Sequence, residues 1–178
     1  MTVLDIPVVR TERLVMRALH DDDLDAFTAV FGDERVYRWL GSTTPPTRDE
    51  MWRSMAMHVG HWALRGYGQW ALELAVTGEL VGRAGLWRPE GWPGLEVGWA
   101  VSVPHWRRGY ATEAGAAALT WAFDHLDVAE VISITAPDNA ASRGVMTKLG
   151  LTYDRTVELR GFEQVLYRIT RDEWAGRG

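Results

Sequence analysis

The chain has 178 residues, no cysteine and a formal net charge of −5 at pH 7. One domain of this size buries a core without disulfides, and the missing thiols exclude Cys nucleophiles and Cys-ligated zinc and favour a reducing compartment. The acidic charge disfavours general binding to nucleic acid or to an anionic membrane, and no apolar run is long enough to cross a bilayer. Because the amino terminus also lacks a basic segment followed by a long apolar one, we predict a cytoplasmic protein.

The first predicted elements are a strand and a helix. Residues 13–19 alternate in polarity as a strand near the edge of a sheet does. Residues 21–23 are three aspartates, which favour the cap and first turn of a helix with an apolar stripe over a metal site. Residues 33–47 contain glycine and two prolines, so we expect a loop with a short aromatic segment.

A second helix is predicted after this loop. Thr47 and Glu50 form a capping box, and apolar residues follow at helical spacing up to Gly66. His58 and His61 lie three positions apart on this helix. No third ligand has suitable spacing, so no metal site is predicted.

Residues 69–103 predict three consecutive antiparallel strands. Segments 69–76 and 79–87 meet at a Thr-Gly turn, which is typical of a hairpin. Over 95–103, bulky residues alternate with Glu96 and small residues, so this strand has one bulky face and one bare face. A bare face beside a carboxylate leaves room for a ligand along the backbone.

A basic turn follows the third strand. Pro104 ends the strand, and the alanine-rich segment 110–125 predicts a helix. Arg107, Arg108 and Gly109 therefore lie where free helix amides, the positive end of the helix dipole and two cations coincide, which suits a phosphate. The turn could equally be an ordinary strand-to-helix connection with solvated arginines.

The last third of the chain predicts a strand, a helix and a hairpin. Segment 131–135 is β-branched, and the preceding helix makes it parallel to the central strand. Asn139 caps a helix that runs to about Lys148, and 152–159 with 162–170 form the hairpin. The chain is thus a mixed α/β protein with a mostly antiparallel sheet and one parallel crossover.

Three motifs occur in a characteristic order between about residues 11 and 170; they are Thr11-Glu12-Arg13-Leu14-Val15-Met16-Arg17, Arg107-Arg108-Gly109-Tyr110-Ala111-Thr112-Glu113-Ala114, and Asn139-Ala140-Ala141-Ser142 leading to Lys148-Leu149-Gly150-Leu151. Together they resemble the GNAT superfamily of acyl-CoA-dependent N-acyltransferases, and within it the branch of ribosomal-protein alanine and serine N-terminal acetyltransferases. The resemblance implies a single domain over 1–178, with six or seven strands, about four helices and a splayed parallel strand pair at the cofactor site.

The resemblance also implies where acetyl-CoA binds. The thioester lies in the gap between the two parallel strands, near the backbone of Val101, Ser102 and Val103. The pyrophosphate rests on the amides of the basic turn, which are those of Arg107, Arg108, Gly109, Tyr110, Ala111 and Thr112. Asn139 has a role as a helix cap and is also a candidate contact with the pantetheine.

The chain departs from the family pattern at two positions. Trp106 stands where the turn usually opens with Gln or Arg, which leaves a backbone cradle intact. Met146 occupies the place of a tyrosine that acts as general acid in many members, and Met has no proton to donate. The branch that the chain resembles implies that Ser142 is then the better candidate for hydrogen-bonding or protonating the departing CoA thiolate.

Amine acetylation needs a base, because only a neutral amine attacks a thioester carbonyl. Glu96 fits this role, since it points to the bare face of the strand and desolvation there would raise its pKa. A backbone N–H of the same strand would stabilise the oxyanion. The alternative for Glu96 is a surface carboxylate in a strand. Glu158 and Glu163, which flank the last hairpin, are rival bases.

Three functions are compatible with these patterns. The leading one is an N-acetyltransferase that acts, as monomer or homodimer, on a primary amine, either a protein amino terminus or a small molecule such as an aminoglycoside or polyamine. The second is a non-catalytic CoA-binding or regulatory domain. The third, a dinucleotide- or NTP-binding enzyme, is disfavoured because neither glycine-rich fingerprint occurs. Acceptor identity resides in segments 37–46 and 87–92 and at Arg160, whose shape the sequence does not fix.

Overall fold

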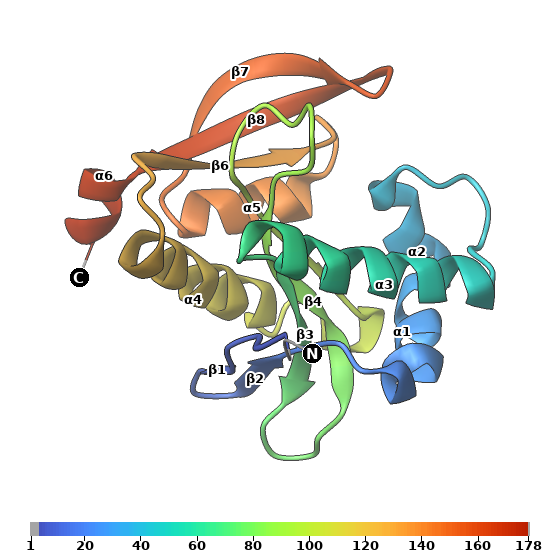
Figure 1. Ribbon diagram of the computed structural model, residues 1–178. Coiled ribbons are helices and arrows are strands. Elements are labelled where there is room, and N and C mark those ends of the chain that lie inside the picture. Colours follow the sequence, from blue (N-terminus) through green and yellow to red (C-terminus); the bar gives the residue numbers. More distant parts are fainter. Residues whose placement is uncertain (1–3, 178) are drawn as a thin grey trace.

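A mixed sheet of eight strands runs through the structure, a computed structural model that describes residues 4–177 (Figure 1). In spatial order the strands are β1-β2-β3-β4-β5-β6-β8-β7. Their bounds are β1 Val9–Arg10, β2 Leu14–Arg17, β3 Gln69–Leu74, β4 Leu80–Trp87, β5 Glu96–Val101, β6 Glu130–Thr135, β7 Thr152–Leu159 and β8 Phe162–Thr170. All neighbours are antiparallel except β5 and β6. The mixed, mostly antiparallel sheet is confirmed, with one or two strands more than predicted.

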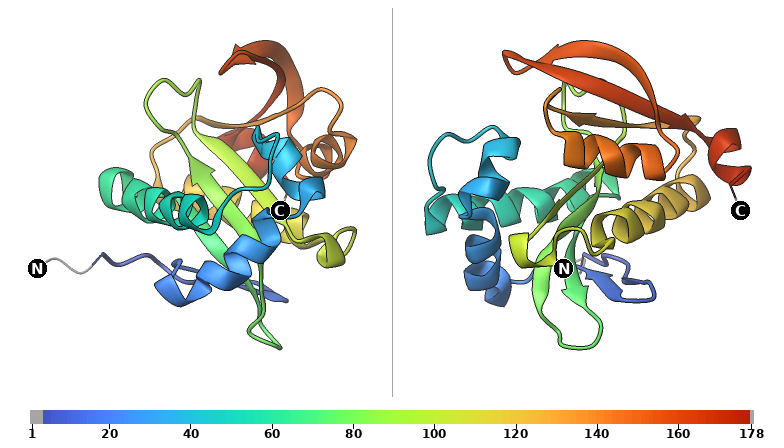
Figure 2. Two further views of the ribbon diagram at one scale, coloured as in Figure 1. Left: turned by 90° about the vertical axis from the view of Figure 1, so that its right-hand side faces the viewer. Right: turned by 180° about the vertical axis from the view of Figure 1, so that it is seen from behind.

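Six helices accompany the described part of the sheet, two more than predicted, because α2 and α6 have only four and five residues. Their bounds are α1 Leu24–Phe31, α2 Glu34–Tyr37, α3 Arg48–Arg65, α4 Tyr110–His125, α5 Ala140–Lys148 and α6 Arg171–Ala175. Figure 2 shows the sheet from two further sides, with α4 and α5 in front of it in the view from behind. No helix within residues 4–177 combines the length and apolar character that a bilayer span requires.

The two faces of the sheet carry separate cores. The larger core joins buried residues of α4 and α5 to β2–β5, as with Leu119 and Met146 packing near Val97. The smaller core joins α1 and α3 to the opposite face through residues such as Phe27, Met55 and Ala100. Alternation in β5 therefore works as predicted up to Val101, since its bulky residues face α4 and its small residues face α1 and α3.

Val103 departs from that alternation. It was expected on the bulky face with Val101, but β5 ends at Val101 and Val103 begins a short 3₁₀ turn that runs to His105. Its side chain packs against the smaller core instead. The physical reason is Pro104, which fixes φ and offers no N–H to a strand ladder.

Local sequence explains how the helices begin. Thr47 and Glu50 form the predicted capping box of α3, and the side chains of Asn139 and Thr170 cap α5 and α6. Helix α4 differs, because it starts at Gly109 with φ of 86° and no side-chain cap. The first amides of α4 are thus left for another partner.

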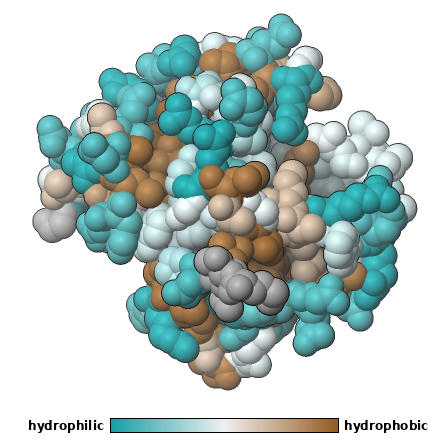
Figure 3. Space-filling view, in the orientation of Figure 1, coloured by the Kyte–Doolittle hydropathy of each residue, from teal (hydrophilic) through white to brown (hydrophobic). Residues whose placement is uncertain are grey.

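The surface carries exposed hydrophobic side chains in several places. Figure 3 shows hydrophobic groups in separate patches among hydrophilic ones on the face seen in Figure 1. The most exposed of the large hydrophobic residues are Leu64 on α3 and Val76 in the β3–β4 turn, at 85% and 95%. Single exposed apolar side chains of this kind are normal on a protein surface.

Candidate functional site

The central parallel strands β5 and β6 part almost as soon as they meet. Their register contains one pair, Glu96 with Ile132, and the Ile132 N–H donates to the Leu95 carbonyl at 2.8 Å. Beyond this point β5 continues to Val101 beside β4 alone. The splayed pair predicted for this position is therefore present, and it opens an edge of β5 whose backbone groups can meet a ligand.

At the far end of that edge, Val101 has its N–H directed toward the gap. The Ser102 N–H donates to the Val81 carbonyl at 2.7 Å, so Ser102 bonds toward β4 and Val101, one residue earlier, faces the other way. The Trp106 indole N–H donates a hydrogen bond to the Val101 carbonyl at 2.6 Å. Of the three predicted backbone contacts, Val101 has an amide that faces the gap, the Ser102 amide is bonded to β4, and Val103 lies in the 3₁₀ turn.

The basic turn has the backbone of an anion cradle. Arg107 and Gly109 adopt left-handed φ values of 60° and 86°, which a non-glycine residue such as Arg107 adopts only at a cost. The first α-helical bond of α4 runs from Glu113 N–H to the Gly109 carbonyl, so the amides of Tyr110, Ala111 and Thr112 have no partner within the helix. Arg107 and Arg108 are exposed directly before these amides, so positive charge and free amides occur in one short segment.

Residues just before β2 hold this turn in place through hydrogen bonds. The Arg13 Nη1 donates to the Arg108 carbonyl at 2.8 Å, and the guanidinium lies 4.8 Å from the centre of the Tyr110 ring. Glu113 accepts hydrogen bonds from Arg13 Nε at 2.7 Å and from Thr11 Oγ1 at 2.5 Å. Burial opposes ionisation of Glu113, but these bonds prevail and lower its pKa. The sequence motif that begins at Thr11 is therefore tied to the turn motif.

Glu96 occupies a desolvated position at the mouth of the strand gap. Burial raises the pKa of its carboxyl to about 7, against the opposing effects of the Trp92 indole, the Ile134 amide and the charge of Arg83. The Trp92 N–H donates to Glu96 Oε2 at 2.6 Å, and the Arg160 guanidinium lies 5.2 Å from the Trp92 ring. Segment 87–92 and Arg160, both expected to shape the acceptor site, therefore meet at Trp92, beside the predicted base.

The rival carboxylates lie in a different environment. Glu158 and Glu163 face each other near the tip of the β7–β8 hairpin, and both are exposed. Of the three candidates, Glu96 is the one that the fold removes from water.

Helix α5 carries Asn139 and Ser142. The Asn139 Oδ1 accepts from the Ser142 N–H at 3.1 Å, which is the predicted cap. The Ser142 hydroxyl is partly buried and makes no hydrogen bond within residues 4–177. Met146 is completely buried in the larger core, so its position faces the protein interior. Ser142 therefore has the free hydroxyl group of this helix.

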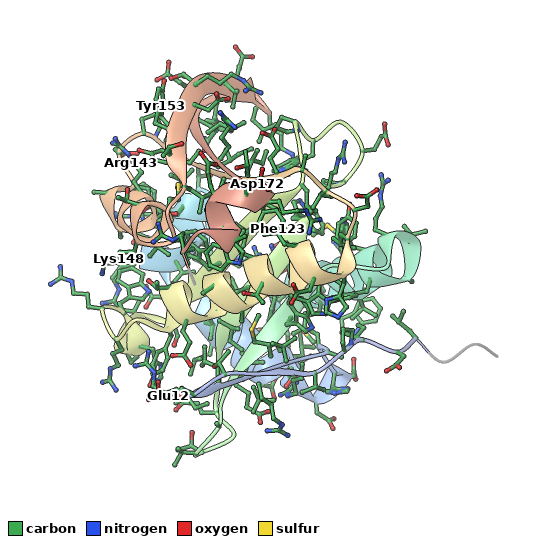
Figure 4. All side chains as sticks on the ribbon, turned by 90° about the vertical axis from the view of Figure 1, so that its left-hand side faces the viewer. Glu12, Phe123, Arg143, Lys148, Tyr153 and Asp172 are labelled. Carbon is green, nitrogen blue, oxygen red and sulfur yellow. The ribbon has the colours of Figure 1, made fainter. Side chains whose placement is uncertain are left out.

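The same helix is anchored to the last hairpin. Arg143 donates to the Tyr167 hydroxyl at 3.1 Å. The Tyr167 and Tyr153 rings pack edge to face, with 5.8 Å between their centres. Figure 4 shows Arg143 on α5 near Tyr153 on β7. This attachment fixes α5 relative to β8 and β6, and hence fixes Ser142 relative to the strand gap.

Several side chains to which the sequence analysis gave no role lie around the predicted site. Trp92 and Arg83 act directly on the ionisation of Glu96, Trp106 holds the end of β5, and Arg13 holds the turn. The Trp92–Glu96 spacing of four residues was visible but ambiguous, because a contact across a loop depends on the loop's path. Arg13 contacts Glu113, which lies one hundred positions later in the chain, so no local sequence pattern indicates this contact.

Comparisons with known proteins identify the family. Residues 13–152 match the family model of the acetyltransferase (GNAT) domain. The chain is 31% identical, over 98% of its length and 80% of the relative's, to the FsC-acetyl coenzyme A-N(2)-transacetylase of Aspergillus fumigatus. An acetyltransferase structure from Agrobacterium tumefaciens superposes with a TM-score of 0.83 at 30% identity, covering 95% of this chain and 97% of that one.

The fold is also similar to that of the ribosomal-protein-S5-alanine acetyltransferase from Vibrio fischeri. That structure superposes with a TM-score of 0.75 at 14% identity and covers 95% of this chain and 99% of its own. At this identity the likeness concerns the fold alone. The family match and the relative of 31% identity carry the assignment. The chain belongs to the GNAT acetyltransferase family and is an acyltransferase.

Proposed function

We propose that this acyltransferase moves the acetyl group of acetyl-CoA to a primary amine by direct attack. The observation that carries the proposal is the alignment of three features along one strand. Glu96 lies where β5 and β6 part, the free N–H of Val101 lies at the end of the opened edge, and the turn of Arg107 and Gly109 follows. These features supply a base, an oxyanion donor and a phosphate cradle in sequence.

The residues divide the reaction between them. Glu96 takes a proton from the incoming ammonium, so that the neutral nitrogen forms a bond to the thioester carbon. The Val101 N–H donates to the carbonyl oxygen as negative charge develops there. When the carbon–sulfur bond breaks, the electron pair stays on sulfur, and the Ser142 hydroxyl donates a hydrogen bond to the thiolate. The nitrogen gives up its second surplus proton, which neutralises the thiolate, so that the products are a neutral amide and the CoA thiol. A carboxyl pKa of about 7 leaves Glu96 ionised in a large fraction of molecules at neutral pH while keeping it basic.

The basic turn would hold the anionic part of acetyl-CoA. The chemistry fits, because Arg107 and Arg108 bring positive charge and the amides of Gly109, Tyr110, Ala111 and Thr112 converge at the start of α4. Asn139 would contact the pantetheine through the part of its amide that the cap leaves free. The Aspergillus relative is an FsC-acetyl coenzyme A-N(2)-transacetylase, and this activity supports both the donor and a nitrogen acceptor.

Thiol release from acetyl-CoA tests the proposal directly. The full chain is mixed with acetyl-CoA and a panel of amines that includes amino acids, amino sugars, polyamines and peptides with free amino termini. We expect amine-dependent release of CoA and an acetylated amine by mass spectrometry. Binding of CoA without release in the presence of every amine would contradict the proposal. A one-domain organisation over 1–178, a cytoplasmic location and a monomeric or homodimeric state, without nucleic-acid or membrane partners, stay predictions.

A further inference from the structure

A polar niche lies on the bare face of β5, on the side of the sheet covered by α1 and α3. Gly85 of β4 pairs with Gly98 of β5 and forms its floor. Gln69 lies in the same row, paired with Gly85, and Arg83 and Glu96 lie in the two neighbouring rows of the same face. A Cβ atom built on Gly98 would meet only Gln69 Nε2 and Glu96 Oε1, each at 3.6 Å. At Gly98 the floor beside the predicted base is therefore bordered by polar groups and is not filled by a side chain, whereas a Cβ atom on Gly85 would meet the Gly68 carbonyl and the Trp70 ring.

Arg83 brings a positive charge to the niche without a matching anion. Its guanidinium donates to Gln69 Oε1 and lies 5.4 Å from the centre of the Phe31 ring. None of the ion pairs within residues 4–177 includes Arg83, whereas Arg13 and Arg17 are each paired with a carboxylate. Burial lowers the pKa of Arg83 to about 10, and the charge of Glu96 opposes this effect. Desolvated charges in proteins are normally paired, so an anion is missing here.

His58, which packs on the same side of the sheet, also lacks a polar partner. It is 3% exposed, and neither ring nitrogen has a hydrogen-bond partner in the described part of the chain. Its ring contacts the edge of Trp87 at 5.2 Å, and Trp87 is the β4 residue paired with Glu96. By contrast, His61, which lies one turn later, has the Tyr67 carbonyl at one ring nitrogen and the Arg88 N–H at the other. Unsatisfied buried polar atoms are rare in native proteins and call for a partner.

We infer that the niche binds the acceptor and that this acceptor is a small amine carrying a carboxylate. The inference rests on the proposed function, because it places the amine at Glu96. Arg83 and Glu96 lie in rows four residues apart, about 13 Å along the strands before their side chains reach inward. A compact zwitterion therefore spans the space with its ammonium group at Glu96 and its carboxylate at the guanidinium, which matches a carboxylate in shape. Polyamines lack this carboxylate. The first residue of a peptide also lacks it, because its carboxyl group is part of the peptide bond.

Matched pairs of amines test the inference. The value of kcat/KM is measured for alanine, methionine, phenylalanine and 4-aminobutyrate against the carboxamide of each. We expect the carboxylate form of at least one pair to be preferred by about ten- to hundredfold, the effect of a charge-assisted bidentate contact. The preference would run against intrinsic reactivity, because the amine of an α-amino amide is less basic and more often neutral. Equal values for all pairs, or a preference for the carboxamides, would overturn the inference.

Variants assign the preference to the niche. In Arg83→Gln the carboxylate preference should fall to within about threefold, with CoA affinity unchanged, and Arg83→Lys should retain part of it. Any effect of Arg83→Gln through the ionisation of Glu96 acts on both members of a pair and cancels in their ratio. Arg10→Gln, which removes the same charge from the exposed strand β1, is the control and should keep the preference. Because Arg83 lacks an anionic partner, its replacement by Gln should leave the melting temperature unchanged or higher. Equal losses for both members of each pair would instead make Arg83 a structural residue and overturn its assignment.

Failure of the inference and failure of the proposed function give different results. Faster turnover of amines without an anion overturns the inference and leaves acetyl transfer standing. If no amine releases CoA, the proposed function fails, and calorimetric titration of the same amino acids into the CoA complex still decides on the niche. Binding that is lost in Arg83→Gln and kept in Arg10→Gln supports the niche, and absence of such binding overturns it.

Discussion

Replacement of Glu96 by Gln should make the protein more stable and less active at the same time. Gln keeps the shape of the side chain and an oxygen for the Trp92 N–H, but it carries no charge at any pH. In the wild type, burial raises the Glu96 pKa from 4.5 to about 7. The folded state therefore binds the proton more tightly than the unfolded state, and ionising Glu96 costs stability.

The sign and size of the effect follow from this difference. The stabilising contribution of the protonated carboxyl is complete below pH 4.5 and is lost as the pH rises through 7. At about 1.4 kcal/mol per tenfold change, the full difference is about 3 kcal/mol, and partial exposure of Glu96 reduces it to about 1–3 kcal/mol. Glu96→Gln should thus match the wild type near pH 4 and exceed its free energy of unfolding by that amount at pH 8. The melting temperature should rise by about 2–4 °C per kcal/mol.

Urea unfolding at pH 4 and pH 8 measures the change in stability, and pH–rate profiles measure the change in activity. Wild-type kcat/KM should fall below a midpoint near pH 7, and Glu96→Gln should lose about 10²–10⁴-fold in turnover with that acidic limb flattened. Activity of the variant should recover partly at high pH, where more of the amine is already neutral. Glu158→Gln, on the exposed hairpin, is the control and should change neither quantity. Unaltered turnover together with an unaltered pH dependence of stability would refute the reasoning and make Glu158 or Glu163 the next base to test.

Three further substitutions test the cofactor side of the site. Ser142→Ala should lower turnover about tenfold or more with CoA affinity within a few-fold, because the hydroxyl acts mainly in the transition state; equal losses in both would make it a binding contact. Gly109→Pro should weaken CoA binding in calorimetry, since it removes an amide and the left-handed φ of 86°, and a folded variant of unchanged affinity would contradict the placement. Arg13→Gln should raise KM for acetyl-CoA several-fold and leave kcat/KM for S-acetylpantetheine, which lacks the pyrophosphate, unchanged; a matching loss with both donors would indicate general unfolding of the turn.

Much of the fold follows from local sequence signals. The bounds of α4 agree with the prediction because an alanine-rich segment follows directly after Gly109, and β7 and β8 agree because the Arg160-Gly161 turn separates two alternating runs. The capping box of Thr47 and the cap of Asn139 are likewise satisfied within a few residues of chain. The strand β1 was missed because two residues carry too little pattern to stand out.

The sequence by itself determined the order of the elements, the family motifs and the residue types that acetyl transfer needs, since periodicity, caps and turns depend on neighbours in the chain. Only the tertiary structure decided where β5 and β6 part, which backbone amides are free, and that Glu96 is the desolvated carboxylate among three candidates. It also brought Arg13 to the turn and left Arg83 without an anion. The physical reason is that desolvation and hydrogen-bond satisfaction depend on which distant segments pack together, and no local pattern encodes that packing.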